Sequence, residues 1–136
     1  MSNIIRLLWI KILGTACFAA LPMLLAPENL YLWLGFPAMP TMLFLRLYGL
    51  STLALLVGYY GGIEACRAGQ FPRAALRMGL VSNATQGAAL LLAGALGVYA
   101  SWGLLAQVMM WSLGGFIAGI AVAIGWTLVR APSHSR

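Results

Sequence analysis

The segment LLAQVMMWSLGGFIAGIAVAIGWTLV, residues 104–129, contains no charged residue, and its one strongly polar side chain is that of Gln107. About 20 consecutive apolar residues are enough for an α-helix to cross the hydrocarbon core of a bilayer. A helix also satisfies its backbone hydrogen bonds internally, as lipid requires. Residues 104–129 therefore predict a transmembrane helix, and the rest of the chain repeats the pattern.

Three further apolar segments precede this one. They run from about residue 7 to 25, from 41 to 63 and from 74 to 98. Of the 136 residues, 62% are hydrophobic and only 7% are charged, and the mean hydropathy is +0.94. A soluble domain carries about 25% charged residues. The predicted fold is all-α: a single membrane domain, residues 1–136, that forms a transmembrane four-helix bundle.

The connections between the spans differ in character. Residues 26–40 contain prolines that bracket Tyr31, Trp33 and Phe36, which are aromatic types that settle at the headgroup level of a membrane. We expect a short helical turn there, lying along the interface between the first two spans. Residues 64–73, by contrast, are polar and basic, and they predict a cytoplasmic connection.

Positive charge gathers on one side of the predicted bundle. With four spans, the N-terminus, the 64–73 connection and the C-terminus share that side. It receives seven of the eight Lys and Arg residues, namely Arg6, Lys11, Arg67, Arg73, Arg77, Arg130 and Arg136. Because Lys and Arg stay cytoplasmic, we expect both termini in the cytoplasm. The bases are spread over span ends instead of clustering on one helix or arm, so nucleic acid is not an expected partner.

The sequence offers no recognisable catalytic or metal-binding constellation. The single histidine, His134, lies in a polar tail, there is no Asp, and Glu28 and Glu64 flank opposite ends of the second span. These residues form neither a Ser-His-Asp triad, nor a carboxylate pair, nor an intramembrane metal site. Cys17 and Cys66 lie at different depths without a C-x-x-C motif, which argues against disulfide exchange. We expect a non-catalytic protein without a cofactor or metal.

Polar and charged residues in or beside the spans are the candidate binding residues: Glu28, Arg46, Asn83, Gln86 and Gln107. Arg46, at the outer end of the second span, snorkels to lipid phosphate, anchors a headgroup, or pairs with Glu28. Asn83 and Gln86, one turn apart, either hydrogen-bond to a neighbouring helix or line a ligand cavity. Gln107 lies at the depth of Arg46 and is a candidate member of the same cluster.

Glycines mark candidate helix-packing positions. Gly79 and Gly87 share one face of the third span, and Gly115 and Gly119 form a stripe of small residues with Ala123. Small residues four apart let membrane helices approach closely. The stripe packs either within the bundle or against another subunit.

Three short motifs carry a family resemblance: Leu25-Ala26-Pro27-Glu28, then Leu34-Gly35, then Leu45-Arg46-Leu47-Tyr48-Gly49. With the span count, they resemble a bacterial family of uncharacterised four-span membrane proteins, often grouped as DoxX-like, over nearly the whole chain. The resemblance implies a left-handed helical bundle in the bacterial inner membrane, and it singles out Glu28 and Arg46 for mutation. Some relatives are associated with quinone or thiol metabolism, but no cysteine motif here supports that association.

We therefore expect a small non-catalytic protein of the inner membrane. It binds a lipid-like or quinone-like molecule between its helices, or it is an accessory subunit of a larger membrane complex. Membrane lipids are its expected partners, together with a membrane-protein partner or a second copy of the chain. The alternative is a minimal transporter or channel for a small solute, which would need Arg46, Thr52, Asn83 and Gln86 to face inward together.

Overall fold

The computed structural model describes residues 2–131, and within them the chain is helical without a β-strand. Four long helical segments carry the fold: Ser2–Leu25, α4 (Leu43–Arg67), α5 (Arg73–Ala95) and α6 (Leu104–Val129). The four predicted spans fall on these segments, with the ends shifted by a few residues in the first three. Two residues discussed above, His134 and Arg136, lie outside the described part of the chain.

The first segment changes its helical form at a proline. It consists of α1 (Ser2–Thr15), the π-helical turn η1 (Ala16–Ala20) and α2 (Leu21–Leu25). Pro22 has no N–H to donate, and its ring crowds the carbonyl of the preceding turn. Immediately before it, the N–H of Leu21 bonds to the carbonyl of Ala16, five residues back. The wider turn absorbs the disruption, so the helix continues through Leu25.

The short helix predicted between the first two spans is α3 (Glu28–Trp33), which begins directly after Pro27. The loop that follows it contacts the loop between α5 and α6. The N–H of Gly103 donates to the carbonyl oxygen of Gly35 at 2.8 Å, and Gly35 has a φ of 90°. A Cβ on Gly35 would lie 2.7 Å from the Cα of Gly103. This contact therefore requires glycine, and it joins two loops that are distant in sequence.

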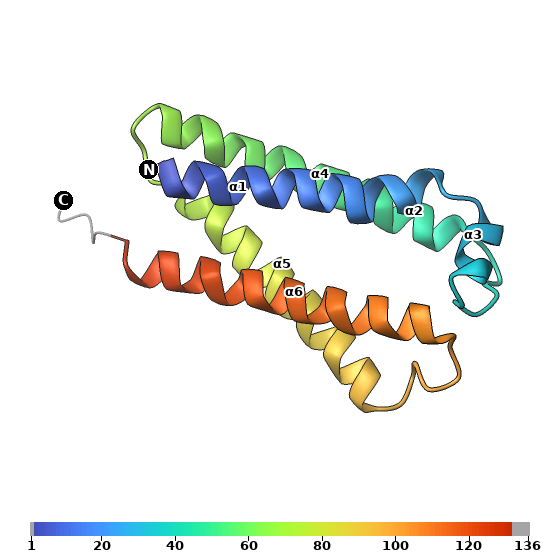
Figure 1. Ribbon diagram of the computed structural model, residues 1–136. Coiled ribbons are helices and arrows are strands. Elements are labelled where there is room, and N and C mark those ends of the chain that lie inside the picture. Colours follow the sequence, from blue (N-terminus) through green and yellow to red (C-terminus); the bar gives the residue numbers. More distant parts are fainter. Residues whose placement is uncertain (1, 132–136) are drawn as a thin grey trace.

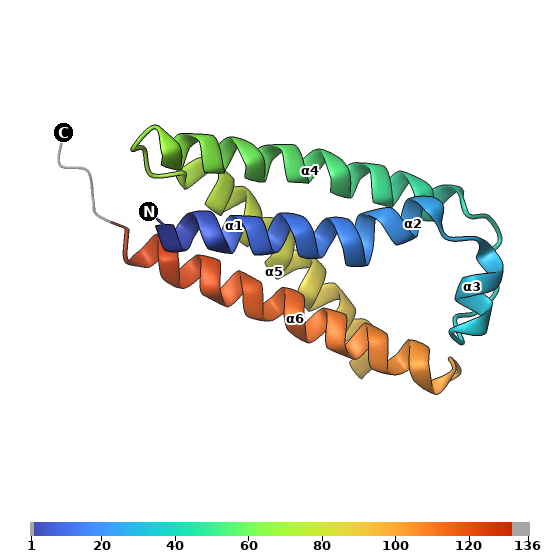
Figure 2. The ribbon, with the colours of Figure 1, turned by 45° about the horizontal axis from the view of Figure 1, so that its top comes forward.

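The helices are arranged as two pairs (Figures 1 and 2). The first segment lies along α4, while α5 runs obliquely and packs closely along α6. The start of α1, the α4–α5 turn and the end of α6 lie together, and we call this the terminal end. Helix α3 and the α5–α6 loop lie at the opposite end, which we call the α3 end.

The distribution of side chains is the reverse of that in a soluble protein. Phe18 and Val129 are each 83% exposed, whereas Asn83 is 1% and Lys11 9% exposed. Soluble proteins seldom expose so much large apolar surface or bury an ammonium group. The first segment, α4 and α6 are each long and apolar enough to cross a membrane. The surface and the composition are those of a membrane protein.

Helix α5 is not among these three because it is more polar, although its length is sufficient. Its 23 residues extend over about 35 Å at 1.5 Å per residue. Polar groups in the middle of α5 are turned inward or bonded within the helix: Asn83 is buried, and the hydroxyl of Thr85 donates to the carbonyl of Val81 at 2.8 Å. Because these polar groups have partners within the protein, they do not require that α5 be surrounded by water.

The apolar core draws on all four segments. Its buried members are Leu8, Leu56, Tyr59, Ile63, Leu76, Ile120 and Ile124. Several of them lie between the polar cluster described below and the terminal end. The core therefore closes that end of the bundle from within.

Candidate functional site

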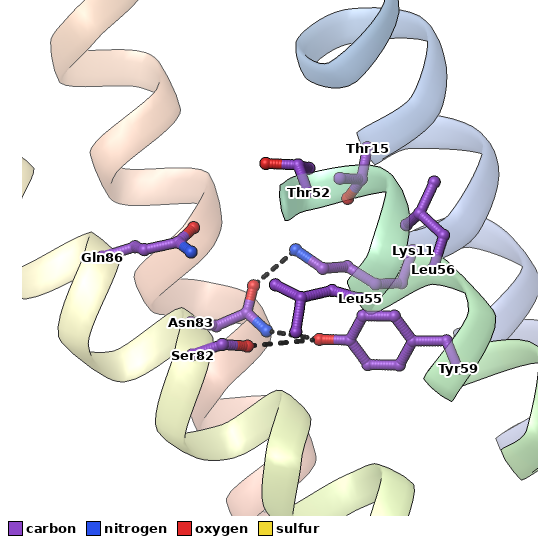
Figure 3. A pocket seen from close by; sticks show the side chains of 9 residues that line it. All are labelled: Lys11, Thr15, Thr52, Leu55, Leu56, Tyr59, Ser82, Asn83 and Gln86. Atoms are coloured by element: carbon purple, nitrogen blue, oxygen red, sulfur yellow. Dashed lines mark hydrogen bonds between the residues drawn. The ribbon is translucent and has the colours of Figure 1, made fainter. Parts of the chain in front are cut away.

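The site is built around Lys11, which lies near the middle of the first segment. Leu8, Lys11 and Thr15 are three and four residues apart and so share one face of the helix. Leu8 is 1% exposed, which shows that this face is directed into the bundle. The Lys11 side chain therefore points toward α5, away from the surrounding surface (Figure 3).

Three helices meet at the Lys11 ammonium through hydrogen bonds. The Nζ of Lys11 donates to the Oδ1 of Asn83 on α5. The Nδ2 of Asn83 donates in turn to the hydroxyl of Tyr59 on α4, at 3.1 Å, and to the carbonyl of Gly79. The hydroxyl of Ser82 lies 3.5 Å from that of Tyr59. Asn83 thus forms hydrogen bonds between helices, and it also lines the cavity described below.

Gly79 makes room for this arrangement. A Cβ at this position would lie 2.9 Å from Cε1 and 3.0 Å from the hydroxyl oxygen of Tyr59. Both distances are shorter than an ordinary van der Waals contact. The absence of a side chain at Gly79 therefore lets the Tyr59 ring reach Asn83.

A small cavity lies beside the ammonium. It is lined by Lys11, Thr15, Thr52, Leu55, Leu56, Tyr59, Ser82, Asn83 and Gln86 and measures about 20 Å³, which is room for about one water molecule (Figure 3). The hydroxyl of Thr52 is engaged with the carbonyl of Tyr48 at 2.8 Å. Within residues 2–131, the side chains of Thr15 and Gln86 make no hydrogen bond. Their polar groups are therefore available to hydrogen-bond to a bound ligand.

The charge of Lys11 has no counter-ion in its surroundings. The chain has two acidic residues, Glu28 and Glu64; the first lies in α3, and the second is exposed on α4. Among the described residues, Asn83 supplies the single hydrogen-bond acceptor for the ammonium. Burial of an unpaired charge costs several kcal/mol, and one bond to a neutral amide recovers roughly 1.5–3 kcal/mol. This imbalance is typical of a functional position in a membrane protein.

The cluster is closed on one side and polar on the other. Toward the terminal end, Leu8, Ile63 and Leu76 are each at most 1% exposed and fill the space below Lys11. Toward the α3 end the lining is polar: Thr15 follows Lys11 by one turn on α1, and Gln86 follows Asn83 by one turn on α5. The site therefore resembles a pocket with a floor, and its polar lining extends toward the α3 end.

Arg46 lies elsewhere, at the end of α2. Its guanidinium donates to the carbonyl of Met23 at 2.9 Å and to that of Ala26 at 2.7 Å. In the described part of the chain it forms no ion pair with Glu28, the partner considered from the sequence. The last carbonyls of a helix have no partner within it, so Arg46 caps the first segment instead.

Tyr31 contributes to the same cap. Its hydroxyl donates to the carbonyl of Pro22 at 2.9 Å. Burial raises the pKa of Tyr31 above its usual 10.0, and the nearby charge of Arg46 lowers it by a smaller amount. The hydroxyl therefore keeps its proton at neutral pH and remains a donor to the helix end.

The remaining candidate residues are not part of the Lys11 cluster. The Nε2 of Gln107 donates to the carbonyl of Trp102 at 2.9 Å, and this side chain does not join Arg46. Gly87 packs against α6, where an added Cβ would lie 3.0 Å from the backbone nitrogen of Ala118. Gly115 and Gly119 are exposed and have no neighbouring atom within 4 Å of an added Cβ. Their stripe thus does not pack within the bundle.

Lys11 and Tyr59, the two partners of Asn83 on other helices, are not among the candidate residues predicted from the sequence. The sequence places Lys11 only among the bases of the base-rich side, from its distance to the N-terminus. A signal for each is present: Lys11 shares a helix face with Leu8 and Thr15, and Tyr59 is seven residues, or two turns, from Thr52. An ionisable residue that interrupts an apolar span is itself such a signal.

Comparison with known proteins does not place the chain in a family. It matches no protein-family model, no curated protein and no solved structure. The resemblance to DoxX-like proteins therefore stays a prediction, and the functional argument depends on the geometry of the site.

Proposed function

We propose that this protein is a four-span protein of the bacterial inner membrane that binds the polar head of a lipid-like or quinone-like molecule beside Lys11. The observation that carries this proposal is a buried ammonium with one neutral acceptor, next to a cavity lined by the unbonded side chains of Thr15 and Gln86. A polar ligand head would satisfy these groups together. No residue of the cluster requires a catalytic role, and the proposal is one of binding.

The four-span topology is supported by the position of α5. It packs along α6 over its length, and Asn83 bonds to Lys11 near the middle of the first segment. A helix that lies at this depth between membrane helices crosses the membrane with them. Ser82, Asn83 and Gln86 line the cavity inside the bundle, which explains how α5 can be more polar than the other three.

The floor of the site favours binding over passage. A channel or transporter needs an aqueous path across the membrane, and the residues that the sequence offers for one are Arg46, Thr52, Asn83 and Gln86. Thr52, Asn83 and Gln86 line the cavity, but Arg46 is engaged at the end of α2. The packed side chains of Leu8, Ile63 and Leu76 block the way to the terminal end.

The proposal is tested by extraction of the protein directly into polymer nanodiscs, followed by mass spectrometry of the bound lipids and quinones. We expect a molecule that is enriched over the bulk membrane extract and is lost from a Lys11→Met variant. Arg6→Met is the matched control because it removes an exposed base from the same helix. Identical lipid profiles for the wild type and Lys11→Met would refute the proposal.

One observation favours a second role, as an accessory subunit. Gly115, Gly119 and Ala123 are exposed on α6 and leave room for the close approach of another helix. Proteomic analysis of the same nanodiscs tests this role. A protein partner that is lost on Gly119→Leu substitution would support it, whereas purification of the chain without a partner would contradict it.

A further inference from the structure

We infer that the group bound beside Lys11 is a carboxylate; this inference rests on the proposed function and names its ligand class. The first argument is charge. The ammonium has three hydrogen-bond donors. Its positive charge is costly to bury in a dry site without a compensating negative charge. Neither Glu28 nor Glu64 reaches it. A neutral quinone carbonyl would accept a hydrogen bond but leave the charge unbalanced, whereas an anion supplies both the acceptor and the counter-charge.

The second argument is size. The cavity of about 20 Å³ accommodates one atom of the size of a water oxygen. A carboxylate can place a single oxygen in such a space while its second oxygen points away. A phosphate or sulfonate head that places one oxygen there must accommodate two further oxygens around its tetrahedral centre, whereas a carboxylate has only one more. The cavity therefore favours the planar, two-oxygen head.

The third argument is the position of the remaining donors. Gln86 and Thr15 line the cavity with Lys11, and both have unbonded polar atoms. Figure 3 shows the Gln86 amide and the Lys11 ammonium directed into the same space. The carboxylate oxygen in the cavity would accept from Lys11 and also from the amide nitrogen of Gln86 or the hydroxyl of Thr15. The rest of the ligand would extend toward the α3 end, because the opposite side is filled by Leu8 and Ile63.

The experiment measures equilibrium binding of radiolabelled dodecanoate to the protein in phosphatidylcholine nanodiscs, with unlabelled competitors. We expect saturable binding that unlabelled dodecanoate displaces and methyl dodecanoate and dodecanol do not. Lys11→Met should weaken binding roughly 10-fold or more, as loss of a hydrogen bond to a charged group implies. Gln86→Leu should weaken it roughly 2- to 10-fold, as loss of a neutral donor implies.

Two control variants distinguish the site from general membrane effects. Arg6→Met removes a base from an exposed position of α1, and Thr85→Val changes an exposed residue next to Gln86. Both should bind dodecanoate as the wild type does. The melting temperature of every variant is recorded without ligand, so that a folding defect is recognised. If Lys11→Met does not fold, the Gln86→Leu result, compared with Thr85→Val, decides the outcome.

The competitors distinguish a small free carboxylate from a carboxylate on an amphiphile. They also distinguish failure of the carboxylate inference from failure of the proposed function. If acetate competes as well as dodecanoate, the ligand is a small free carboxylate; if only dodecanoate competes, it is an amphiphile. Lys11-dependent binding of decyl-ubiquinone without binding of dodecanoate would overturn the carboxylate inference and leave the proposed function intact. Binding of neither probe in a Lys11-dependent manner, with no enriched native lipid, would overturn both.

Discussion

At the scale of single residues, the Lys11 cluster links three helices through one amide. Asn83 accepts from Lys11 and donates to Tyr59 and to its own helix. Both N–H groups of this side chain and one lone pair of its oxygen are thereby engaged, and only the second lone pair is left. Polar contacts between membrane helices average about 0.6 kcal/mol. This one differs because removal of the amide leaves a buried charge without a partner.

We predict that Asn83→Leu destabilises the protein by about 1–3 kcal/mol, since it leaves the Lys11 ammonium and the Tyr59 hydroxyl without their partner. In the double variant with Lys11→Met the charge is gone, so part of the loss should be recovered. The two effects should therefore be non-additive in a double-mutant cycle. Unfolding in bicelles measures all three variants. Strict additivity would mean that the two side chains do not interact.

The sequence identified Asn83 and Gln86 as candidate site residues, but not their main partner. The reason is physical. Depth in the membrane follows from residue number, but the direction of a side chain depends on how each helix is rotated in the bundle. A lysine nine residues after Ser2 can extend to the interface or turn inward at nearly the same depth. Here Leu8, on the same face, is packed in the core, and Lys11 turns inward with it.

At the scale of the elements, the end of the first segment is held by side chains from other helices. Arg46 of α4 donates to the carbonyls of Met23 and Ala26, and Tyr31 of α3 donates to that of Pro22. Lipid offers no replacement for these bonds in the hydrocarbon region. The cap therefore joins α2, α3 and α4 at the α3 end.

We predict that Arg46→Leu costs about 1–3 kcal/mol, because it leaves two carbonyls without donors. Arg46→Lys, which provides one point charge instead of a fork of donors, should cost about half as much. Arg67→Gln, at an exposed position of the same helix, should change stability by less than about 0.5 kcal/mol. Reversible unfolding in detergent provides the measurement. Glu28→Leu should add independently to Arg46→Leu, and strong coupling between them would instead indicate an ion pair.

The close packing of α5 on α6 gives a second prediction at this scale. Gly87→Leu would place a side chain 3.0 Å from the backbone nitrogen of Ala118, where the neighbour cannot rotate away. We expect a loss of about 1–3 kcal/mol, as overpacking costs in well-packed cores. Gly115→Leu, at an open position of α6, is the matched control and should leave the melting temperature of the isolated chain unchanged. An equal loss in both variants would contradict the observed rotation of α6.

This rotation was not available from the sequence. Helix α6 is apolar on all sides and contains no charged residue, so no polar face indicates which side meets lipid. Several small residues along it qualify equally as a packing stripe. The structure places Gly114 and Ala118 toward α5 and leaves Gly115 and Gly119 exposed. In contrast, the positions of the long helices were predictable, because they depend on hydrophobic length and not on rotation.

At the scale of the whole molecule, the two ends of the bundle have different chemistry. The α3 end is joined by the Gly35–Gly103 contact and by aromatic rings, with Phe36 and Trp102 centred 5.5 Å apart. The terminal end brings together Arg6, Arg67 and Arg130, which are exposed. An aromatic end and a basic end are typical of an oriented membrane protein. The basic end is the expected cytoplasmic side.

The orientation and the number of spans can be tested together. Four spans with a cytoplasmic N-terminus return the C-terminus to the cytoplasm, whereas three spans, with α5 outside the membrane, would leave it outside. We predict that a fusion after Arg136 gives fluorescent GFP and inactive alkaline phosphatase. Single cysteines provide the internal check, once Cys17 and Cys66 are replaced. Ser101→Cys should react with an impermeant maleimide in intact cells, and Gln70→Cys only after permeabilisation.

The opposite outcome has a clear meaning because the two topologies differ at the C-terminus. An active phosphatase after Arg136, with Gln70→Cys and Ser101→Cys labelled from the same side, would show that α5 does not cross. That result would conflict with the bond between Asn83 and Lys11, since Lys11 lies near the middle of a segment that is long and apolar enough to cross. It would also expose Arg130 and Arg136 on the outer side, against the preference of basic residues for the cytoplasm. The contacts of α5 and the distribution of charge therefore both support the proposed four-span arrangement.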